Sequence, residues 1–541
     1  MINRQTKGIV MIDLGLLGTC GLFFHRVGNK MMGLDLTKKA GKEFFGNLAD
    51  SGAVPVLSRV GGLLNESGVR GYVVGGFVRD TLLGRTTPDI DIAVAADALE
   101  IARRVADALN GKYVLLDEAF GVARVIFAEE KAAEGHWQLD FSSYEGDIEQ
   151  DLARRDFTID AMAIDIGHLI EESRNVRLID PYDGCEDLER RVVRGVGEAI
   201  FEADAVRLLR AVRLAAELGF SIDSDTEYQI RRHAHLVAGI AGERVREELL
   251  RLLVMPGSGQ FVFYLDRLGL LTAVLPELLV LKGVEQPREH FWDVFRHSLE
   301  TVLAVDFLLR QGDWEHAEGE LLATVPWSAK LARHFEREVS SGSTGGALLR
   351  LAALLHDVAK PQTKTIEPDG RMRFLGHAQE GASIAVAALE RLRFSTKETR
   401  LVETMVKYHL RPMQMSQEGL PTHRAIYRYF RDAGEAGVDT LFLSMADHLA
   451  TRGPHLDRAG WQEHTRIVDY VLKQYYGQKK QVRPVKLVDG HDLINIFGLS
   501  PGPGLGKLLE AVREAQAVGE VTSREEALEY VRNRLSAEGN A

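Results

Sequence analysis

Two aspartates separated by a single residue are the first groups in the sequence that could do chemistry. Asp89 and Asp91 stand in the segment PDIDIAV, whose β-branched residues predict a strand. Because side chains alternate across a strand, both carboxylates would lie on one face, with Ile90 and Ile92 on the other. Mg²⁺ prefers hard oxygen ligands together with substrate phosphates, and two such ions hold an attacking hydroxyl and a leaving group in line. The simpler alternative is a solvated strand face.

A glycine pair upstream of the aspartates predicts a phosphate site. Gly75 and Gly76 follow the apolar run Tyr72–Val74 and precede FVRDTLLG, whose pattern predicts a helix. Glycines at a strand-to-helix turn let the backbone approach phosphate closely, and the helix N-terminus favours an anion. Arg79 on the first turn could fork onto phosphate oxygens. Most such glycine pairs merely make turns, so the prediction depends on the aspartates that follow.

Asp140, in the segment WQLDFSS, offers a third carboxylate. If its strand pairs beside that of Asp89 and Asp91, we expect Asp140 to help deprotonate the attacking hydroxyl. A structural or capping role is the alternative.

An acidic residue and three arginines recur at every third position further along the chain: Asp204, Arg207, Arg210 and Arg213. This spacing predicts one slowly drifting face of a helix. Unpaired arginines so close would repel one another, and a bound triphosphate would relieve this. Asp204 and Arg207 could also choose a base, because a carboxylate accepts hydrogen bonds where a guanidinium donates them. Cytosine and adenine present an amino donor beside an acceptor, whereas uracil and guanine present the reverse. The alternative to a nucleotide-binding role for these four residues is an amphipathic helix with a solvated charged face.

Histidines and aspartates in the C-terminal half form a second group with metal-binding chemistry. His356 and Asp357 are adjacent within ALLHDVAKP, which is predicted as an apolar helix. A buried carboxylate is costly without a cation nearby. Mixed imidazole and carboxylate ligands suit a transition metal or Mg²⁺, which could activate water to hydrolyse a phosphate ester. The other candidates in this half are His297, His377, His409 and Asp447.

Composition limits the classes of protein to which the chain can belong. A chain of 541 residues is too long for one hydrophobic core, so several domains are expected. The net charge of -12 argues against a general nucleic-acid coat, although a local basic face could still bind RNA. Cys20 and Cys185 form neither a disulfide framework nor a thiolate zinc site, and they suit a reducing cytosol. The apolar segment Ile9–Phe24 is interrupted by Asp13 and too short to span a bilayer, so we expect a cytoplasmic protein without a membrane anchor.

Three regions differ in their hydrophobic patterns. Between residues 56 and 183, short β-branched runs alternate with helical stretches, which predicts an α/β domain. Residues 188–255 are helical and rich in arginine, and residues 260–477 are helical with scattered histidines. Within the latter, residues 311–346 are less regular and predict a loop or an insertion. The tail carries a Gly/Pro run between two helical patterns.

The segment GGFVRDTLLGRTTPDID resembles the signature of the bacterial and eukaryotic-type tRNA nucleotidyltransferases and of the related bacterial poly(A) polymerases. The resemblance continues through RRDFTIDAMA, LIDPYDGCEDLERRVVR, DAVRLLRAVRLAAELGF and ERVREELLRLL, and so covers most of residues 70–255. It implies an α/β nucleotidyltransferase head with a mixed sheet, followed by an all-α neck, body and tail. The expected boundaries are an appendage of unknown role at 1–50, the head at 51–185, the neck at 186–258, the body at 259–478 and a tail that could contact tRNA at 479–541.

The resemblance also implies an activity. The family transfers C and A residues from CTP and ATP to the tRNA 3′ end without a nucleic-acid template, with Mg²⁺ in the head. Arg154, Arg155 and Asp156 of the RRD motif would hold the ribose and the triphosphate. The expected partners are therefore the tRNA 3′ end, CTP and ATP, and the sequence leaves the oligomeric state open.

The histidine-rich half resembles an HD domain. His297, His356, Asp357 and Asp447 match its H…HD…D ligand positions, and His377 with His409 would belong to a second site. Such a domain implies phosphatase or phosphodiesterase activity with a divalent metal, and Mg²⁺, Mn²⁺, Ni²⁺ and Fe²⁺ are all open. The alternative is a degenerate domain that serves as a scaffold or an RNA platform.

The sequence departs from the family pattern in three places. Ala203 replaces the usual Glu before Asp204, Asp160 replaces the usual Asn of the RRDFTINA motif, and the stretch between Asp140 and Arg154 is short. The short stretch resembles the enzymes that add only the two cytidines. A CC-adding enzyme and a poly(A) polymerase are therefore alternatives, although DEAFGVARVIF, in place of a basic strand, favours the tRNA branch. Two alternatives belong to other functional classes. The chain could be an HD phosphohydrolase whose head is a nucleotide-binding module, or a non-catalytic RNA-binding protein.

Overall fold

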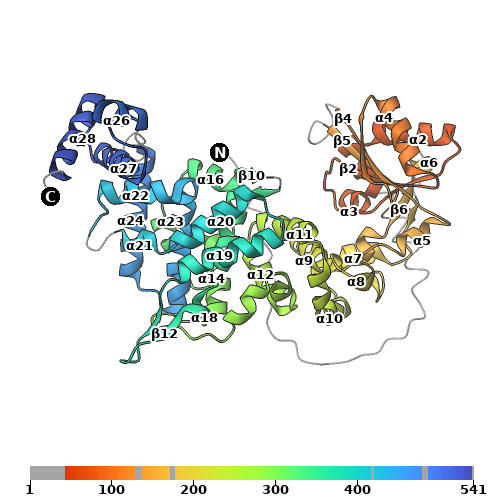
Figure 1. Cartoon of the computed structure of the whole chain (residues 1–541). Coiled ribbons are helices and arrows are strands. Elements are labelled where there is room, and N and C mark those ends of the chain that lie inside the picture. The colour runs from red at the N-terminus through yellow and green to blue at the C-terminus, as the bar shows by residue number, and fades with distance from the viewer. Residues whose placement is uncertain are drawn as a thin grey trace, which may run out of the picture. The chain divides into compact units, whose positions relative to one another are not determined.

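The computed structural model describes residues 40, 43–128, 136–170, 177–317, 319–340, 342–415, 419–477 and 485–538. The apolar segment Ile9–Phe24, and most of the predicted appendage, lie outside these residues. The described residues form two compact units (Figure 1). The first contains the residues up to Glu149 together with Met162–Glu186, and the second contains Gln150–Ala161 and the chain from Asp187 onwards. Across the described ranges, no helix has the length and apolar character needed to cross a membrane.

The first unit is built on one mixed sheet, as predicted for the head. Its strands follow the order β3-β4-β5-β2-β1-β6-β7. The β2–β5 pair is parallel and the other neighbours are antiparallel. The strands are β1 (Gly71–Val74), β2 (Asp89–Val94), β3 (Lys112–Asp117), β4 (Val122–Ala128), β5 (His136–Ser143), β6 (Ala163–Asp165) and β7 (Leu178–Ile179).

Alternation of side chains gives strands β2, β4 and β5 one apolar and one polar face. Ile90, Leu139 and Val125 share one row of the pairing across β2, β5 and β4, and all three are fully buried. Helix α4 (Ala98–Leu109) packs on β3, β4 and β5 and presents its own buried residues, so it covers the apolar face. Asp97 caps the start of α4 by accepting from two backbone N–H groups, and Asn110 ends the helix in the left-handed conformation. The polar face of β2, β4 and β5 carries the candidate chemistry.

The second unit is almost entirely helical, as predicted. The neck comprises α8 (Ile200–Ala203), α9 (Arg207–Leu218), α10 (Ser224–His233) and α11 (Gly242–Val254). The prediction of a loop for residues 311–346 is wrong in part, because α15 (Gly319–Thr324), α16 (Ala329–Glu336) and the short hairpin of β10 (Glu338–Ser340) and β11 (Ser343–Thr344) lie there. Helix α16 forms because Ser328 caps it and Leu331 and Phe335 are buried on one side.

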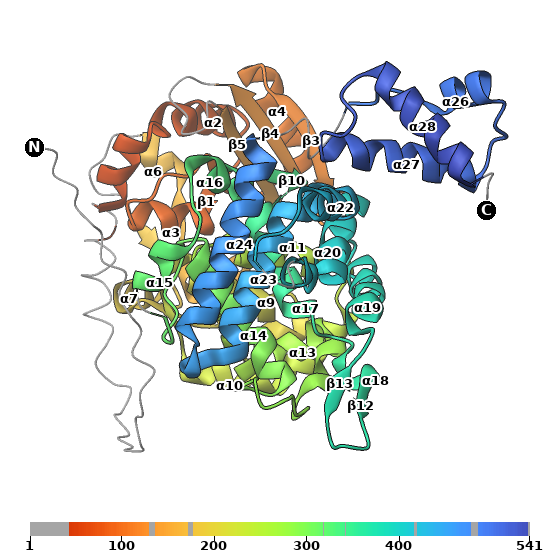
Figure 2. The ribbon, with the colours of Figure 1, turned by 90° about the vertical axis from the view of Figure 1, so that its left-hand side faces the viewer.

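The body packs α14, α17, α19, α20 and α23 against one another (Figure 2). Their bounds are α14 (Val294–Leu308), α17 (Gly345–Leu355), α19 (His377–Arg391), α20 (Thr396–Tyr408) and α23 (Gly437–Arg452). Arg350 of α17 and Asp306 of α14 form a buried ion pair at 2.5 Å, and Arg350 also donates to the carbonyl of Leu253. Because both side chains are only 1% exposed, this contact requires the helices to meet in one arrangement.

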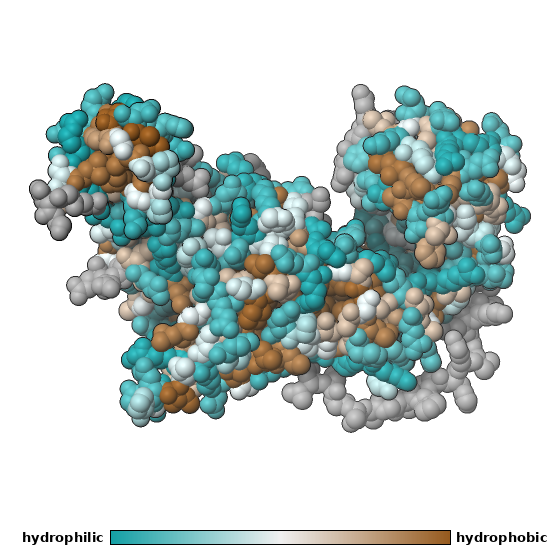
Figure 3. All heavy atoms as spheres, in the orientation of Figure 1, coloured by the Kyte–Doolittle hydropathy of each residue, from teal (hydrophilic) through white to brown (hydrophobic). Residues whose placement is uncertain are grey.

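The tail consists of α26 (Gly490–Phe497), α27 (Pro503–Ala517) and α28 (Arg524–Glu538). Leu493, Val512 and Val531 form the centre of its own small core, and apolar side chains also gather on the face of the tail visible in Figure 3. The predicted Gly/Pro turn between two helices is confirmed, since Gly502 and Pro503 begin α27. Helix α22 (His423–Ala433) contacts α27 through Arg428, which donates to both carboxylate oxygens of Glu514 at 2.6 and 2.7 Å.

Candidate active site and metal centre

Asp89 and Asp91 lie on the polar face of β2, as their spacing predicts. Asp89 is exposed and Asp91 half-buried, whereas Ile90 and Ile92 are fully buried on the opposite face. Two adjacent carboxylates repel each other unless a cation lies between them, and oxygen ligands of this kind suit Mg²⁺. The donor set of β2 therefore fits the divalent ion that the resemblance implies.

The glycine turn has the backbone that the prediction requires. Gly75 has φ 68° and ψ -140°, a conformation that residues with a side chain rarely adopt, and it leads directly into α3 (Gly76–Leu82). Arg79 lies on this short helix and is 7% exposed. It donates to both oxygens of Asp80 at 3.1 and 2.9 Å, so its guanidinium is held in a defined orientation.

Asp140 lies directly beside Asp91 in the parallel pairing of β5 with β2. The expectation that its strand pairs beside the first is thus confirmed. Both of its oxygens accept hydrogen bonds from Arg124 of β4, at 2.6 and 2.7 Å. Arg124 was not among the predicted site residues, although it is a lone charged residue in the apolar strand pattern VARVIFA.

The RRD motif belongs to the second unit together with the neck helices. Asp156 is 8% exposed and accepts from Arg210 at 2.9 Å, while Arg155 donates to Asp151. The carbonyl of Arg154 accepts from Arg207 at 2.7 Å. The motif is therefore tied to the arginine row of the neck.

The arginine row has counter-charges from the chain itself. Glu248 of α11 is 6% exposed and accepts from Arg213 at 2.5 Å and from Arg210 at 3.2 Å. Arg213 donates further to Glu217. Arg210 and Arg213 are thus already paired with carboxylates, so a triphosphate is not needed to relieve the repulsion between these two arginines.

The prediction that Asp204 shares a helix face with the arginines is wrong. Helix α9 begins at Arg207, and Asp204 precedes it in an extended conformation at φ -153°. Its carboxylate accepts from the N–H of Val206 and its carbonyl from the N–H of Arg207, which makes a turn before the helix. Arg244 donates to both of its oxygens at 3.0 and 2.8 Å. Arg244 was not singled out in the sequence, although it lies in the quoted segment ERVREELLRLL.

The histidines and aspartates of the body come together in the buried centre between its helices. His297 Nε2 lies 3.2 Å from His356 Nε2, 3.4 Å from Asp357 Oδ2 and 3.1 Å from Asp447 Oδ1. On the other side of Asp357, His377 Nε2 lies 3.4 Å from Oδ1, and His409 Nε2 lies 3.9 Å from it. His297, His356 and Asp357 form one group of possible ligands, and Asp357, His377 and His409 form a second, so the two groups share Asp357. Asp447 adds a carboxylate to the first group.

The hydrogen bonds of the rings suit metal binding. His356, His377 and His409 each direct Nδ1 at a backbone carbonyl, at 2.8, 2.6 and 2.7 Å. Because a carbonyl only accepts, Nδ1 carries the proton and Nε2 of a neutral ring keeps its lone pair for a cation. Burial raises the pKa of Asp357, but His356 and Lys360 outweigh it and hold the pKa well below its usual range. An ionised, buried carboxylate among imidazole nitrogens fits divalent ions.

Residues outside the predicted set also line this centre. Lys360, one helical turn after Asp357, lies 2.6 Å from its Oδ2 and is 6% exposed. His290 packs edge-on against His297, with ring centroids 5.6 Å apart. Asp447 is the most accessible member of the first group, with its side chain 20% exposed against 0–2% for His297, His356 and Asp357. Access from solvent to this group is therefore on the side of Asp447.

The prediction that His356 and Asp357 lie inside a helix needs correction. Helix α17 ends at Leu355, and both residues lie in the turn that follows. His356 donates back to the carbonyl of Ala353, so its ring folds over the end of the helix. Both side chains point into the centre from this turn.

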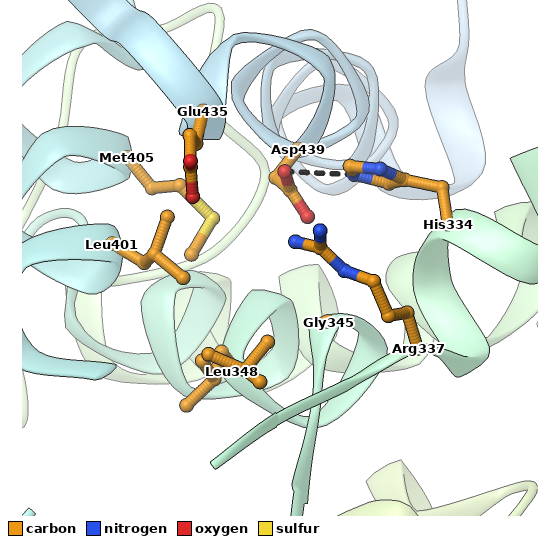
Figure 4. A pocket seen from close by; sticks show the side chains of 9 residues that line it. His334, Arg337, Gly345, Leu348, Leu401, Met405, Glu435 and Asp439 are labelled. Atoms are coloured by element: carbon orange, nitrogen blue, oxygen red, sulfur yellow. Dashed lines mark hydrogen bonds and ion pairs between the residues drawn. The ribbon is translucent and has the colours of Figure 1, made fainter. Parts of the chain in front are cut away.

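A small cavity elsewhere in the body has a different character (Figure 4). His334 and Asp439 face each other across it at 2.9 Å, and Arg337 points toward the same carboxylate. Leu348, Leu401 and Met405 form its apolar side. Burial lowers the pKa of His334, but Asp439 outweighs it and leaves the pKa raised.

The order of domains along the chain matches known families. Residues 71–194 match the poly A polymerase head domain, and residues 219–281 match the probable RNA- and SrmB-binding site of polymerase A. Residues 322–452 match the HD domain, and residues 461–531 match a putative tRNA nucleotidyltransferase domain 2. The fold and the carboxylate face thus define a nucleotidyltransferase with an HD domain in its helical body.

Whole-chain relatives narrow this class. The chain is 35% identical to a CC-adding tRNA nucleotidyltransferase of Thermus thermophilus over 85% of its own length and 92% of the relative. It is 34% identical to an A-adding tRNA nucleotidyltransferase of Deinococcus radiodurans, over 85% of this chain and 94% of the relative. The chain belongs to the tRNA nucleotidyltransferase family, which confirms the resemblance drawn from its sequence, and it is an enzyme of that class.

Solved structures agree with this fold. A CCA-adding enzyme in complex with ATP has a TM-score of 0.58, with 22% identity, and covers 91% of this chain and 98% of its own. The Thermotoga maritima CCA-adding enzyme complexed with tRNA has a TM-score of 0.53 at 22% identity. The match covers 89% of this chain and 95% of that enzyme. At these identities the likeness shows the fold alone.

Proposed function

We propose that this tRNA nucleotidyltransferase adds cytidines to the tRNA 3′ end, with Asp89 and Asp91 as the catalytic carboxylates. The observation that carries the proposal is the position of both carboxylates on one open face of β2, opposite a fully buried face. Mg²⁺ held there would stabilise the charge that develops as the terminal hydroxyl attacks the α-phosphate of CTP and pyrophosphate leaves. Gly75, Gly76 and Arg79 would bind phosphate oxygens.

The neck supplies the groups for choosing the base. Asp204 would accept from the amino group of cytosine, and Arg207 would donate to its neighbouring acceptor. The motif of Arg154, Arg155 and Asp156, tied to the same arginine row, would bind the ribose and the triphosphate. Arg210 and Arg213 would orient this motif and α11 through Asp156 and Glu248.

Cytidine addition without the final adenosine is favoured by the connection after Asp140. Strand β5 ends at Ser143 and α5 (Ile148–Leu152) begins soon after, so residues 144–147 alone connect them. Such a connection leaves little freedom for a loop that would rearrange the site from C to A. Adenosine addition is the second candidate, because an A-adding enzyme is a relative at almost the same identity as the CC-adding one.

The experiment offers the purified protein tRNA that ends at the discriminator base, at C or at CC, with CTP and ATP supplied separately. We expect two cytidines on the first substrate, one on the second and none on the third, with no product from ATP. Extension of the CC-ending tRNA with ATP alone would favour A addition. Long adenylate tails on unstructured RNA would indicate a poly(A) polymerase instead.

For the HD domain we propose hydrolysis of phosphate esters at the centre around Asp357. The proposal of bound divalent metal is supported by the converging histidines and Asp357, with Asp447 beside them. It is also supported by the Nδ1 bonds that leave Nε2 of three of the histidines to a cation. A divalent ion held by these residues would supply the activation of water for attack on the ester. The test is phosphatase and phosphodiesterase activity of the purified chain. Hydrolysis that survives Asp91→Ala and is lost in Asp357→Ala would assign the hydrolytic activity to the body. Hydrolysis that survives Asp357→Ala would refute the proposal.

We further propose a cytoplasmic location for the protein, since the substrate of the proposed nucleotide transfer is tRNA.

A further inference from the structure

Three polar residues form one row across the open face of the head sheet. The pairing places Asp91 of β2 opposite Asp140 of β5, and Asp140 opposite Arg124 of β4. The neighbours on each side in β4 and β5, such as Val125 and Leu139, are fully buried on the opposite face. Arg124 therefore stands on the same face as the carboxylates.

The guanidinium of Arg124 engages Asp140 completely. Its Nε donates to Oδ1 at 2.6 Å and its Nη2 to Oδ2 at 2.7 Å, which is the two-point geometry that arginine prefers. Nη1 donates at 2.8 Å to Oε1 of Gln138, the residue opposite Asp89 in the sheet. Three nitrogens of Arg124 thus donate to two residues of β5, which fixes the guanidinium in place. The fork raises the pKa of Arg124, which burial opposes, and the charges of Asp89 and Asp91 raise it further.

This arrangement changes what Asp140 can do. Both of its oxygens already accept short, charge-assisted hydrogen bonds, so a cation at Asp140 must compete with the guanidinium for the carboxylate. The fork also lowers the negative charge of this face, because it places the positive charge of Arg124 beside Asp140. A cation that approaches β2 therefore meets less negative charge than the carboxylates alone would present.

We propose that Arg124 is a positioning residue that withholds Asp140 from the cation site of the head. With the fork closed, a cation in the nucleotide-free protein is held without the full contribution of Asp140 and therefore binds more weakly. A triphosphate would supply further oxygen ligands and so tighten the binding of the ion. This inference rests on the proposed function only in its assignment of β2 as the cation site.

The test measures binding of Mn²⁺, a paramagnetic substitute for Mg²⁺, by electron paramagnetic resonance on the full chain without nucleotide. To remove the ions of the body, all variants carry Asp357→Ala. We expect Arg124→Met to strengthen binding about tenfold, because a nearby positive charge is lost and Asp140 is released. Arg124→Lys, which keeps the charge but cannot span both oxygens, should lie between Met and the parent. Arg124→Met with Asp140→Asn should return close to the parent affinity.

Arg103→Met is the matched control, because Arg103 is an exposed arginine of the same unit on α4 and stacks over Tyr113. It should leave Mn²⁺ binding unchanged. With CTP present, Arg124→Met should lower kcat for incorporation while KM for CTP changes less than about twofold, as expected for loss of an orienting group. The side chain of Arg124 is 31% exposed, so its replacement leaves no closed cavity; thermal melting checks that the variants fold.

An unchanged Mn²⁺ affinity in both folded Arg124 variants would overturn the inference. Stronger binding in Arg124→Met that persists after Asp140→Asn would also overturn it, because Asp140 would then not be the group released. If the expected affinities are found but no protein incorporates CMP, the proposed function fails and the role of Arg124 stands.

Discussion

Asp204 and Arg244 form a two-point ion pair in the neck, with distances of 3.0 and 2.8 Å. Burial raises the pKa of Asp204, but the hydrogen bonds and the charge of Arg244 outweigh it and leave the pKa lowered. The carboxylate proposed to read the base is thus ionised and oriented before any nucleotide binds. A base that presents an amino group can donate to a remaining lone pair of these oxygens, whereas a base that presents an acceptor there cannot.

This relationship predicts the effect of Asp204→Asn on base selection. The amide has one acceptor and adds a donor, so it should tolerate UTP and lose preference for CTP. We expect the ratio of kcat/KM for CTP over UTP to fall roughly 10- to 100-fold, the value of one hydrogen bond to a charged group. Asp225→Asn, on the exposed first turn of α10, is the control and should keep the ratio. An unchanged ratio in Asp204→Asn would place base recognition elsewhere.

Removal of one head carboxylate should abolish nucleotide transfer without unfolding the protein. Asp91→Ala loses a ligand of the proposed Mg²⁺ site, and a metal contributes several kcal/mol to the transition state, so CMP incorporation should fall about 1000-fold or more. Radiolabelled CTP and gel separation of the tRNA products measure this. Asp107→Ala, an exposed carboxylate of α4, should leave incorporation within twofold of the parent. Full activity of Asp91→Ala would refute the assignment.

The metal content of the body should depend on its two ligand groups separately. We expect His409→Ala to lower the number of bound divalent ions, measured by elemental analysis after gel filtration, by one per chain. Asp357→Ala should remove both ions, because both groups share this carboxylate. Asp369→Ala, in the exposed turn after β12 (Lys364–Ile366), should change nothing. Chelation of the parent should likewise stop hydrolysis, and equal metal content in all variants would contradict a shared site.

The buried ion pair between Arg213 and Glu248 should matter for stability more than surface pairs do. Both side chains are at most 10% exposed. Arg213→Met leaves Glu248 with Arg210 alone and should lower the free energy of unfolding by about 3 kcal/mol. The exposed pair of Arg231 and Glu227 provides the comparison, since Arg231→Met should cost about 0.5 kcal/mol or less. Urea unfolding followed by circular dichroism measures both, and equal losses would show that Glu248 finds another partner.

The pair of His334 and Asp439 predicts a pH dependence of stability. Because the folded protein raises the pKa of His334, the stabilisation is complete below the pKa of the unfolded chain, about 6.5. It is lost as the pH rises through the folded value. The melting temperature of the parent should therefore fall, relative to His334→Gln, as the pH increases from about 6 into the alkaline range. Parallel melting curves of the two proteins over this range would contradict the prediction.

The sequence by itself determined much of the chemistry because the relevant signals are local. The alternation of Asp89, Ile90 and Asp91 sets which face of a strand each side chain occupies, whatever the strand packs against. The turn at Gly75 follows from a backbone conformation that favours glycine. The family resemblance then predicted the order of the domains and the residues proposed as HD ligands.

The tertiary structure decided which of these groups meet. Arg124 contacts Asp140 only because β4 and β5 pair in one register, and a shift by one residue would place Arg124 on the apolar face. Glu248 reaches Arg213 from another helix, and Asp357 lies between two histidine groups from four separate segments. Local patterns determine the face of a side chain, whereas its partners depend on strand register and helix packing between residues distant in the chain. For this reason the sequence identified the carboxylates and histidines, and the structure alone showed that Asp140 is held by an arginine and that Asp357 is shared.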